Sequence, residues 1–465
     1  MLVRGRAWVV SALLWKRGLS MALARSEVRR RVEVVALRVP VRRTGEYLKR
    51  LRPHLLNMPR LRNTADDGDS KDFKLILLSE ALRDVGELSE AREWLGGELA
   101  RGEATARRHA FEVDYSYFTA EEALRLMLPA DVTVPSSFEQ AGHVVHLNLR
   151  EEHEPYKRDV AAVVLDKTHG CRTVVNKVGN VSSAYRTFPL EVLAGDDDTV
   201  VELKQSDCLF RFDFRRVYWN SRLQAEHARL VDLLADEAHQ RRRDTSSDKE
   251  EDRSSSVVVA DATCGVGPFA LPLGRAGLSV LANDLNPAAV EALRDNQRRN
   301  GIAASLLQSH RGCARSFLRR HDGAYSHVIL NLPAAGIDLL DAFKGLTSRP
   351  FVFCYCFANA KTTSVLDDLA TRVTAALGTS PPPFRSSVVE DDAQDDAKRS
   401  PLFPSTAVRD AYDAAAAGEG TSVRWIRNVA PAKDMLCLAF RVPAACRFLS
   451  YDGTDSVGDD DDDDD

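Results

Sequence analysis

The stretch that most constrains the fold of this chain is residues 257–286, which read VVVADATCGVGPFALPLGRAGLSVLANDLN. An apolar, β-branched run ends at Asp261, and such a run is typical of a strand that is buried on both faces. Gly265 and Gly267 then turn the chain, because glycine adopts positive φ and lets a ligand approach the backbone. Pro268 suits the first position of a helix. We therefore predict a strand, a glycine-rich turn and a helix whose N-terminus faces a ligand.

A second strand, predicted over Ser279–Asn283, ends at a carboxylate that suits a ribose. Asp284 lies 23 residues after Asp261, where a carboxylate can accept hydrogen bonds from both ribose hydroxyls. An adenosine-containing ligand is the first interpretation. Two others stay open, because Gly265–Ala270 also fits the G-x-G-x-x-G/A pattern of dinucleotide enzymes, and a glycine turn can join a strand to a helix without any ligand.

The segment Asn331–Ala334 (NLPA) favours one of these interpretations. It follows the apolar run Val328–Leu330, at the expected end of a fourth strand. An Asn-x-Pro sequence at that place resembles the motif with which amino-methyltransferases hold a planar nitrogen substrate beside a sulfonium methyl group. The sequence therefore predicts S-adenosyl-L-methionine, rather than NAD, as the cofactor.

Composition limits the partners of the chain. Its 465 residues, of which 44% are hydrophobic, suffice for two or three domains with sizeable cores. The formal charge is −5, but removing the seven aspartates at 459–465 leaves +2, so binding of a nucleic acid requires a local basic face. The eight cysteines are scattered and do not predict a zinc site, and no apolar run approaches the length of a membrane span.

The order of predicted elements divides the chain. Residues 1–30 resemble a mitochondrial presequence, because they are rich in arginine and contain no acid before Glu27; an unstructured extension is the alternative. The predicted divisions that follow are a small α/β module at 31–107, an α+β domain at 108–240, a charged linker at 241–256, a nucleotide-binding domain at 257–445 with a proline-rich acidic insertion near 379–410, and an acidic tail at 446–465.

Basic residues gather in the small module and could meet a phosphate backbone, or could simply form a solvated face; they are Arg42, Arg43, Lys49, Arg50, Arg52, Arg60 and Arg62. A helix predicted to reach His239 places Arg222, Glu226 and Arg229 on one face. Residues 423–441 read as a terminal antiparallel hairpin on an otherwise parallel α/β sheet. Such a mixed sheet is the architecture of class I (Rossmann-like) methyltransferases.

Several motifs stand together in one order: VYWNSRL with Glu226-His227, then GVGPF, NDLNP, NLPA and RNVAP. With them, residues 31–443 closely resemble the eukaryotic and archaeal family of tRNA (guanine-N1)-methyltransferases that act at position 37, beside the anticodon. The resemblance implies an α/β class I methyltransferase domain preceded by α+β tRNA-binding domains. It also implies that the module at 31–107 recognises the outer corner of tRNA and that the later domains grip the anticodon stem-loop.

The resemblance further implies the activity. The chain is expected to transfer a methyl group from S-adenosyl-L-methionine to N1 of guanosine 37, which supports reading-frame maintenance, and to do so as a monomer without a membrane partner. Together with the arginine-rich start, it suggests the mitochondrial matrix and the cytoplasm as locations, with the nucleus as a third. Two alternatives stay open: an aminocarboxypropyltransferase of the wybutosine pathway and a catalytically idle tRNA-binding protein.

Site residues carry over from the family's motifs to this sequence. Glu226 matches the catalytic glutamate, which would remove the N1 proton, and Arg186 matches the arginine that would stabilise charge on O6. Asn331 would hold the guanine edge and Pro333 would shape its slot. The other residues expected at the site are Tyr218 and Arg222 for the RNA, and His227, Asp261, Gly265, Gly267, Asp284, Leu285, Cys313 and Ala314, with Asn331, for the cofactor.

One position departs from the family pattern. Cys313 stands where an acidic residue usually contacts the adenine, and a thiol is a weak substitute for a carboxylate acceptor. We therefore expect weaker binding of the cofactor. No metal is expected in the chemistry, which depends mainly on the orientation of N1 toward the methyl group.

Overall fold

The computed structural model describes residues 28–58, 60–88, 92–135, 138–179, 185–244, 256–359, 364–386, 415 and 420–451. Residues 1–27 of the predicted presequence, most of the linker, most of the acidic insertion and residues 452–465 of the tail therefore lie outside the described residues. The described chain forms two compact units. The first comprises residues up to 139, 144–177 and 191–197, and the second comprises 140–143, 178–190 and the residues from 198 onward.

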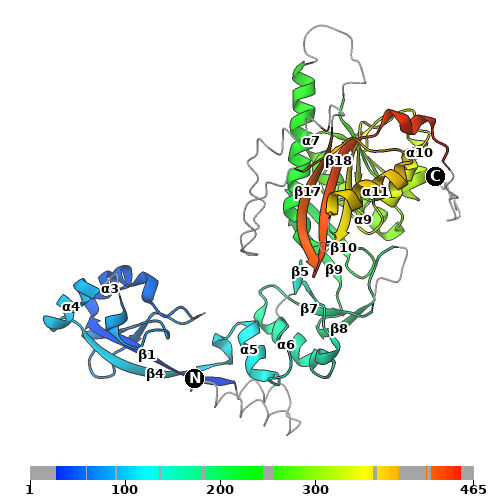
Figure 1. Cartoon of the computed structure of the whole chain (residues 1–465). Coiled ribbons are helices and arrows are strands. Elements are labelled where there is room, and N and C mark those ends of the chain that lie inside the picture. The colour runs from blue at the N-terminus through cyan, green and yellow to red at the C-terminus, as the bar shows by residue number, and fades with distance from the viewer. Residues whose placement is uncertain are drawn as a thin grey trace. The chain divides into compact units, whose positions relative to one another are not determined.

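The first unit begins with an antiparallel sheet of four strands in the order β2-β3-β1-β4 (Figure 1). These strands are β1 (Arg29–Pro40), β2 (Thr64–Asp66), β3 (Phe73–Leu77) and β4 (Thr105–Asp114), and the helices beside them are α3 (Thr44–Arg50) and α4 (Arg92–Ala100). β4 pairs with β1 from Thr105 to Asp114. The predicted module boundary at 107 is therefore wrong, because it cuts a strand whose pairing extends seven residues further.

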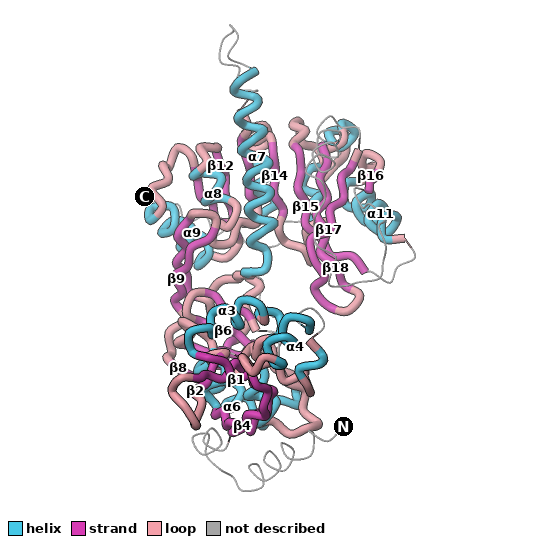
Figure 2. The backbone as a smooth tube through the Cα atoms, turned by 90° about the vertical axis from the view of Figure 1, so that its left-hand side faces the viewer, coloured by secondary structure: helices cyan, strands magenta, loops and turns pink. Residues whose placement is uncertain are grey.

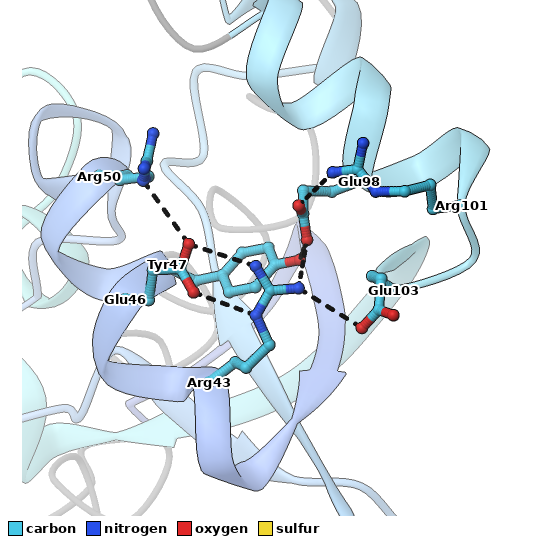
Figure 3. Close-up of polar contacts among 7 residues, drawn as sticks. All are labelled: Arg43, Glu46, Tyr47, Arg50, Glu98, Arg101 and Glu103. Carbon is cyan, nitrogen blue, oxygen red and sulfur yellow. Dashed lines mark hydrogen bonds and ion pairs between the residues drawn. The ribbon is translucent and has the colours of Figure 1, made fainter.

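A buried acid fastens α3 to α4 in this module (Figure 3). Glu98 on α4 is 3% exposed and accepts hydrogen bonds from Arg43 at 2.6 Å, from Arg101 at 2.6 Å and from the Tyr47 hydroxyl. These donors, with Arg43 first, hold the pKa of Glu98 at about 2. Glu103, at 3.4 Å from Arg43, is more exposed. The cluster uses Arg43 internally, so this cation belongs to the fold rather than to an open basic face.

The rest of the first unit has a second small sheet and two helices. Its elements are α5 (Ala120–Met127), α6 (Lys157–Lys167), β6 (Val144–Leu147), β7 (Thr173–Lys177) and β8 (Leu190–Gly195), while β5 (Glu139–Ala141) lies where the chain passes from one unit to the other. Thr119 and Glu122 form a capping box at the start of α5. The apolar faces of α5 and α6 share one core with β6 and β7, which includes Leu124 and Val160.

The second unit contains a sheet of eight strands in the order β13-β12-β11-β14-β15-β18-β17-β16. The strands are β11 (Val258–Asp261), β12 (Ser279–Asp284), β13 (Leu307–Arg311), β14 (His327–Leu330), β15 (Phe351–Asn359), β16 (Phe384–Ser386), β17 (Thr421–Ala430) and β18 (Lys433–Arg441). The strands from β11 to β15 are parallel, and β18 is antiparallel to β15 and to β17. The predicted class I sheet with a terminal hairpin is confirmed.

Figures 1 and 2 both draw β17 and β18 side by side. β16 lies beyond them and pairs with β17 in parallel. Residues 384–386 therefore belong to the sheet, although the sequence predicted an insertion outside the core. The pattern missed them because a strand of three residues has too little periodicity to stand out in a proline-rich stretch.

Helices and a two-stranded ribbon complete the second unit. They are α7 (Gln224–Asp244), α8 (Ala270–Arg275), α9 (Pro287–Arg299), α10 (Ala314–Arg320) and α11 (Val365–Leu377), with the ribbon β9 (Val200–Gln205) and β10 (Cys208–Asp213). α7 continues past the predicted end at His239. Asn296 and Asn300 on α9 accept hydrogen bonds from backbone N–H groups of β10, which fixes the ribbon to the nucleotide-binding domain.

Short 3₁₀ turns join many of these elements; they are Val41–Arg43, Arg52–His54, Val85–Glu87, Tyr115–Tyr117, Glu151–Tyr156, Ser221–Leu223, Asp338–Phe343 and Ala444–Phe448. No helix among the described residues is apolar over a length sufficient to cross a membrane.

Replacing Glu98 with Gln should destabilise the small module. The change removes a buried charge from a paired cluster, and breaking such a pair costs about 3–5 kcal/mol. Because the folded pKa is lowered, the stabilisation by Glu98 is complete above the unfolded pKa and is lost as pH falls toward 2. Urea titrations with hydrogen exchange of β1 and β4 measure both effects.

The matched control is Glu103→Gln, which removes a more exposed acid that contacts the same arginine. We expect a change below about 1 kcal/mol for this variant. Equal losses for the two variants, or a Glu98→Gln protein as sensitive to acid as the parent, would contradict the assignment of Glu98 as the central acid.

Candidate functional site

The glycine turn after β11 leaves space beside its backbone. Gly265 has a φ of 55°, and a Cβ added there would meet no atom within 4 Å. Gly267 has a φ of 94°, and its Cβ would come within 2.5 Å of the Leu293 side chain. Gly267 is therefore required by packing, whereas Gly265 borders open space that a ligand can use. The helix α8 starts at Ala270, two residues later than the predicted start at Pro268.

Asp284 at the end of β12 is tied to this turn. Its two carboxylate oxygens accept hydrogen bonds from the backbone N–H groups of Gly265 and Asn286, each at 2.8 Å. Each oxygen keeps a second acceptor position, so the predicted contact with ribose hydroxyls is chemically open. Partial burial raises the pKa of Asp284. Leu285, the residue between Asp284 and Asn286 in the chain, is half-buried.

Asp261 at the end of β11 is fully buried. Within the described residues, neither of its carboxyl oxygens has a hydrogen bond of normal geometry. Burial, and then the negative charge of Asp284, raise the pKa of Asp261 to about 8. A buried acid without a partner costs stability, and a cationic ligand group would relieve that cost.

His227 on α7 has a buried ring nitrogen that can donate a hydrogen bond, whereas Asp261 offers an acceptor. Its Nδ1 faces the side-chain amide of Gln205 at 3.1 Å, and its ring meets Phe269 edge-on at 4.7 Å. Burial lowers its pKa to about 4, so the ring is neutral and, with Gln205 donating to Nδ1, the proton sits on Nε2. That Nε2 is buried and has no partner in the described part of the chain.

Asn331 follows β14, as predicted. Its backbone N–H donates to Thr263 Oγ1 at 3.0 Å, which ties the NLPA segment to the loop after β11. The amide oxygen of its side chain is buried and has no hydrogen-bond partner among the described residues. The carbonyl of Pro333 accepts from Phe357 on β15 at 3.1 Å, so the segment is fixed at both ends.

Together these groups fit the predicted cofactor. An unpaired carboxyl at Asp261 suits an ammonium group, and an unpaired N–H at His227 suits a carboxylate. Asp284 retains acceptors for ribose hydroxyls, and Gly265 leaves room beside the backbone. A methionine zwitterion joined to adenosine carries all these complements.

Glu226 on α7 is a buried acid that accepts hydrogen bonds from more than one side chain. It is 7% exposed, and Arg229 binds both of its oxygens at 2.7 Å. The Tyr355 hydroxyl on β15 donates to Oε1 at 2.8 Å, and Arg424 Nε on β17 lies 3.5 Å from Oε2. The carboxylate therefore sits among donors from three elements of the sheet and helix.

The structure brings together some, but not all, of the predicted residues. Arg186 is half-buried with a φ of 56° and has no hydrogen bond or ion pair within the described residues, so its predicted place near Glu226 stays a prediction. Tyr218 is 50% exposed, and its hydroxyl accepts from Asn220 at 3.3 Å. Arg222 is exposed in the 3₁₀ turn Ser221–Leu223, just before α7.

Cys313 and Ala314 lie at the start of α10. Cys313 is the N-cap of that helix, but its side chain makes no capping hydrogen bond. Its neighbour Arg315 is engaged by Asp341 at 2.7 Å. The N-cap of α10 therefore lacks the acceptor that the usual acidic residue would supply.

Sequence reasoning missed Tyr355, Arg424 and Gln205. Tyr355 lies within the apolar run of β15, and its hydroxyl becomes relevant only because α7 brings Glu226 to it. Arg424 lies in β17, where the alternation of residues predicts one buried face of the strand. This alternation does not predict which helix covers that face. No signal in the local sequence identifies these long-range contacts.

A separate cavity of about 580 Å³ lies in the first unit. Its lining includes Arg60, Lys167 and His169 beside Phe118 and Phe138. None of the predicted site residues borders it, so its size does not make it the catalytic centre. Across the described residues no group of three His, Cys, Asp or Glu side chains could hold a metal ion.

Two models of known protein families match the chain. Residues 120–199 match the TYW2 N-terminal domain, and residues 201–375 match the TRM5/TYW2 methyltransferase domain. The second match contains the glycine turn, Glu226 and Asn331.

Similar proteins span nearly the whole chain. The chain is 36% identical over 433 residues to the tRNA (guanine(37)-N(1))-methyltransferase of Phytophthora infestans, covering 90% of this chain and 92% of that protein. It is 31% identical to the protein of the same name from Batrachochytrium dendrobatidis, covering 89% and 86%.

Solved structures share the fold. Trm5b from Pyrococcus abyssi has a TM-score of 0.53 and 18% identity, covering 88% of this chain and 99% of that one. The protein in a complex of aTrm5 and tRNALeu has the same TM-score and identity, covering 88% and 100%. At this identity the likeness establishes the arrangement of elements only.

Gly265→Ala should weaken binding of S-adenosyl-L-methionine at least tenfold, because the added methyl group fills the space beside the turn. Gly277→Ala is the matched control: its φ is 80°, its Cβ would also meet nothing within 4 Å, and it lies in another turn. Both variants carry backbone strain of about 1 kcal/mol. Calorimetric titration with the cofactor gives the affinities, and equal affinities for both variants would contradict a ligand at Gly265.

Cys313→Asp should strengthen binding of the same cofactor about tenfold, because a hydrogen bond to a charged acceptor contributes about 1.5–3 kcal/mol. Cys313→Ser is the control, since it also caps α10, at a gain of about 1 kcal/mol in stability, but offers no charge to the adenine amine. Thermal melting and titration separate the two effects. A gain in stability without a gain in affinity for Asp would show that the adenine is held elsewhere.

Proposed function

Because this chain belongs to the tRNA (guanine(37)-N(1))-methyltransferase family, we propose that it transfers a methyl group from S-adenosyl-L-methionine to N1 of guanosine 37 in tRNA. The relatives that carry this name match about nine tenths of the chain. The observation that carries the proposal is the buried carboxylate of Glu226, which accepts a hydrogen bond from Tyr355 on β15. Asn331 directly follows β14, the strand beside β15 in the same sheet.

Guanine N1 needs a base before it can attack. N1 carries a proton, so its electron pair becomes available only when that proton leaves, and Glu226 accepts it. The negative charge that develops moves toward O6, where the guanidinium of Arg186 stabilises it. The unpartnered amide of Asn331 holds the guanine edge, and Pro333 limits the slot.

The cofactor supplies an electrophilic methyl group on a sulfonium when it is bound. N1 attacks the methyl carbon, the carbon–sulfur bond breaks, and its electron pair stays on sulfur. Asp284 holds the ribose, while Asp261 and His227 bind the two ends of the amino acid zwitterion. Catalysis is mainly the orientation of N1 in line with the carbon–sulfur bond.

Recognition of tRNA is assigned to the first unit and to Tyr218 and Arg222 of the second. Arg43 and Arg50 make ion pairs, and Arg60 bonds the Ser116 carbonyl. The exposed cations left for phosphates from the predicted set are Arg42, Lys49, Arg52 and Arg62. A base held inside a protein pocket must leave its stack, and RNA loops permit this most easily.

Location and assembly form part of the proposal. The arginine-rich residues 1–26 favour import into the mitochondrial matrix, and the cytoplasm and the nucleus are the further locations in this proposal. One chain contains all the predicted domains, which favours a monomer. Import assays with and without residues 1–20 test the first statement, since Met21 offers an internal start.

Purified enzyme should form N1-methylguanosine in a tRNA transcript with guanosine 37 and not in one with adenosine 37. Glu226→Gln should slow single-turnover transfer by about 10²–10⁴-fold, because the general base is lost. Asn331→Ala should also slow it. The control is Asp236→Asn, which removes an exposed acid further along α7. Mass spectrometry of the nucleosides is the measurement.

The product mass also tests the related reaction. The match to a TYW2 N-terminal domain keeps the aminocarboxypropyl transfer as the second candidate. An aminocarboxypropyl adduct would replace the proposed function, and cofactor binding without any product would support an idle tRNA-binding protein.

A further inference from the structure

The two oxygens of Glu226 are not equivalent. Oε1 accepts from Arg229 Nη2 at 2.7 Å and from the Tyr355 hydroxyl at 2.8 Å. Oε2 accepts from Arg229 Nε at 2.7 Å. Arg424 Nε stands 3.5 Å from Oε2, which is an ion pair longer than a normal hydrogen bond.

The two oxygens differ in the number of hydrogen-bond acceptor positions that remain open. A carboxylate oxygen offers about two positions for donors. Arg229 and Tyr355 take both positions on Oε1, whereas Arg229 takes only one on Oε2. An incoming N1–H therefore finds its acceptor on Oε2.

We propose that Oε2 of Glu226 is the atom that takes the N1 proton, and that Tyr355 and Arg229 are positioning residues that present it. This inference rests on the proposed function. Neither residue touches the substrate: each acts through the carboxylate that it holds.

The placement of Tyr355 suits this role. β15 runs parallel to β14, and Cys354 pairs with Leu330, the last residue of β14. Tyr355 and Asn331 are the next residues along these two strand directions. Phe357 bonds the Pro333 carbonyl, and the Tyr355 ring lies 6.0 Å from Phe269. The tyrosine is 1% exposed, so water does not compete for its hydroxyl. One strand therefore fixes both the guanine slot and the carboxylate.

Arg229 contributes charge as well as direction. Arg229 lies three residues after Glu226 on α7, and its guanidinium group donates to both carboxylate oxygens. This bidentate contact fixes the plane of the carboxylate. After proton transfer the glutamic acid is neutral and the pair loses its charge–charge attraction. The acid then gives its proton to water, which restores the resting pair.

The proton and electrons balance in the step. The N1–H bond breaks, its proton bonds to Oε2, and its electron pair forms the bond from N1 to the methyl carbon. The carbon–sulfur pair returns to sulfur, so the sulfonium becomes a neutral thioether. The positive charge of the cofactor leaves as the released proton.

The groups that face Glu226 do not titrate near neutral pH. They are Arg229 and His227 on α7, Tyr355 on β15, Arg424 on β17 and Cys437 on β18. Burial raises the pKa values of Tyr355 and Cys437, and lowers that of His227 to about 4. The guanidinium groups stay charged. These groups therefore keep the same charge across the pH range of the assay.

The test is Tyr355→Phe in the full chain, measured as single-turnover methyl transfer to a tRNA transcript between about pH 5 and pH 9. We expect a rate loss of about 10-fold to 100-fold, as for a hydrogen bond to a charged group. The loss should appear in the rate at saturating tRNA and cofactor, because the variant removes a donor to the carboxylate and leaves the binding groups in place. Affinities for tRNA and cofactor should stay unchanged.

The matched control is Tyr325→Phe, which also removes a buried hydroxyl, one that donates to the Leu318 carbonyl at 2.9 Å. It should keep the parental rate profile. If Tyr355→Phe matches this control, or loses affinity for tRNA or cofactor together with the rate, the positioning role is wrong.

A second variant covers the case in which Tyr355→Phe fails to fold. Arg229→Lys keeps the charge but cannot bond both oxygens, so we expect a slower rate with unchanged cofactor affinity. A parental rate for Arg229→Lys would overturn the inference. A parent enzyme that forms no N1-methylguanosine would instead overturn the proposed function, and thus the two failures are distinguishable.

Discussion

The contact between α7 and the sheet is the constraint on which the rest of the site depends. Glu226 reaches Tyr355 on β15, and further along the helix Glu237 lies 3.3 Å from His327 on β14. Two contacts on two neighbouring strands fix both the position and the rotation of the helix. The reactive carboxylate thus gains its place from long-range packing, since α7 precedes the nucleotide-binding domain in the chain.

The residues predicted to hold the cofactor include buried polar groups without hydrogen-bond partners. Their unfavourable free energy can be removed when the cofactor binds. Asp261 is fully buried, its carboxyl oxygens make no hydrogen bond of normal geometry among the described residues, and Asp284 adds a like charge nearby. Burying an unpaired polar group is unfavourable by about 1–3 kcal/mol. The unpaired N–H of His227 adds to this cost. Such groups persist because the ligand, rather than the protein, completes their hydrogen bonding.

The sequence predicted the parts of the fold that depend on local residue chemistry and on the order of the strands. The glycines at 265 and 267 and the acids at 261 and 284 identify the cofactor cradle, because each follows from one turn or one strand end. The ends of β4 and the strand β16 could not be predicted, since their pairing partners lie far away in the chain. Tyr355 was hidden for the same reason, because in sequence it is one residue of an apolar strand.

Charge was the least predictable property of the first unit. The sequence shows seven lysines and arginines between residues 42 and 62 of the small module, but not which of them are neutralised. Arg43 completes a buried cluster around Glu98, and the Arg60 side chain bonds a backbone carbonyl, so neither side chain is wholly available to an RNA phosphate. A count of cations therefore overstates a binding face. Only the structure separates arginines that hold the module together from those that remain exposed, because pairing depends on acids up to 60 residues away.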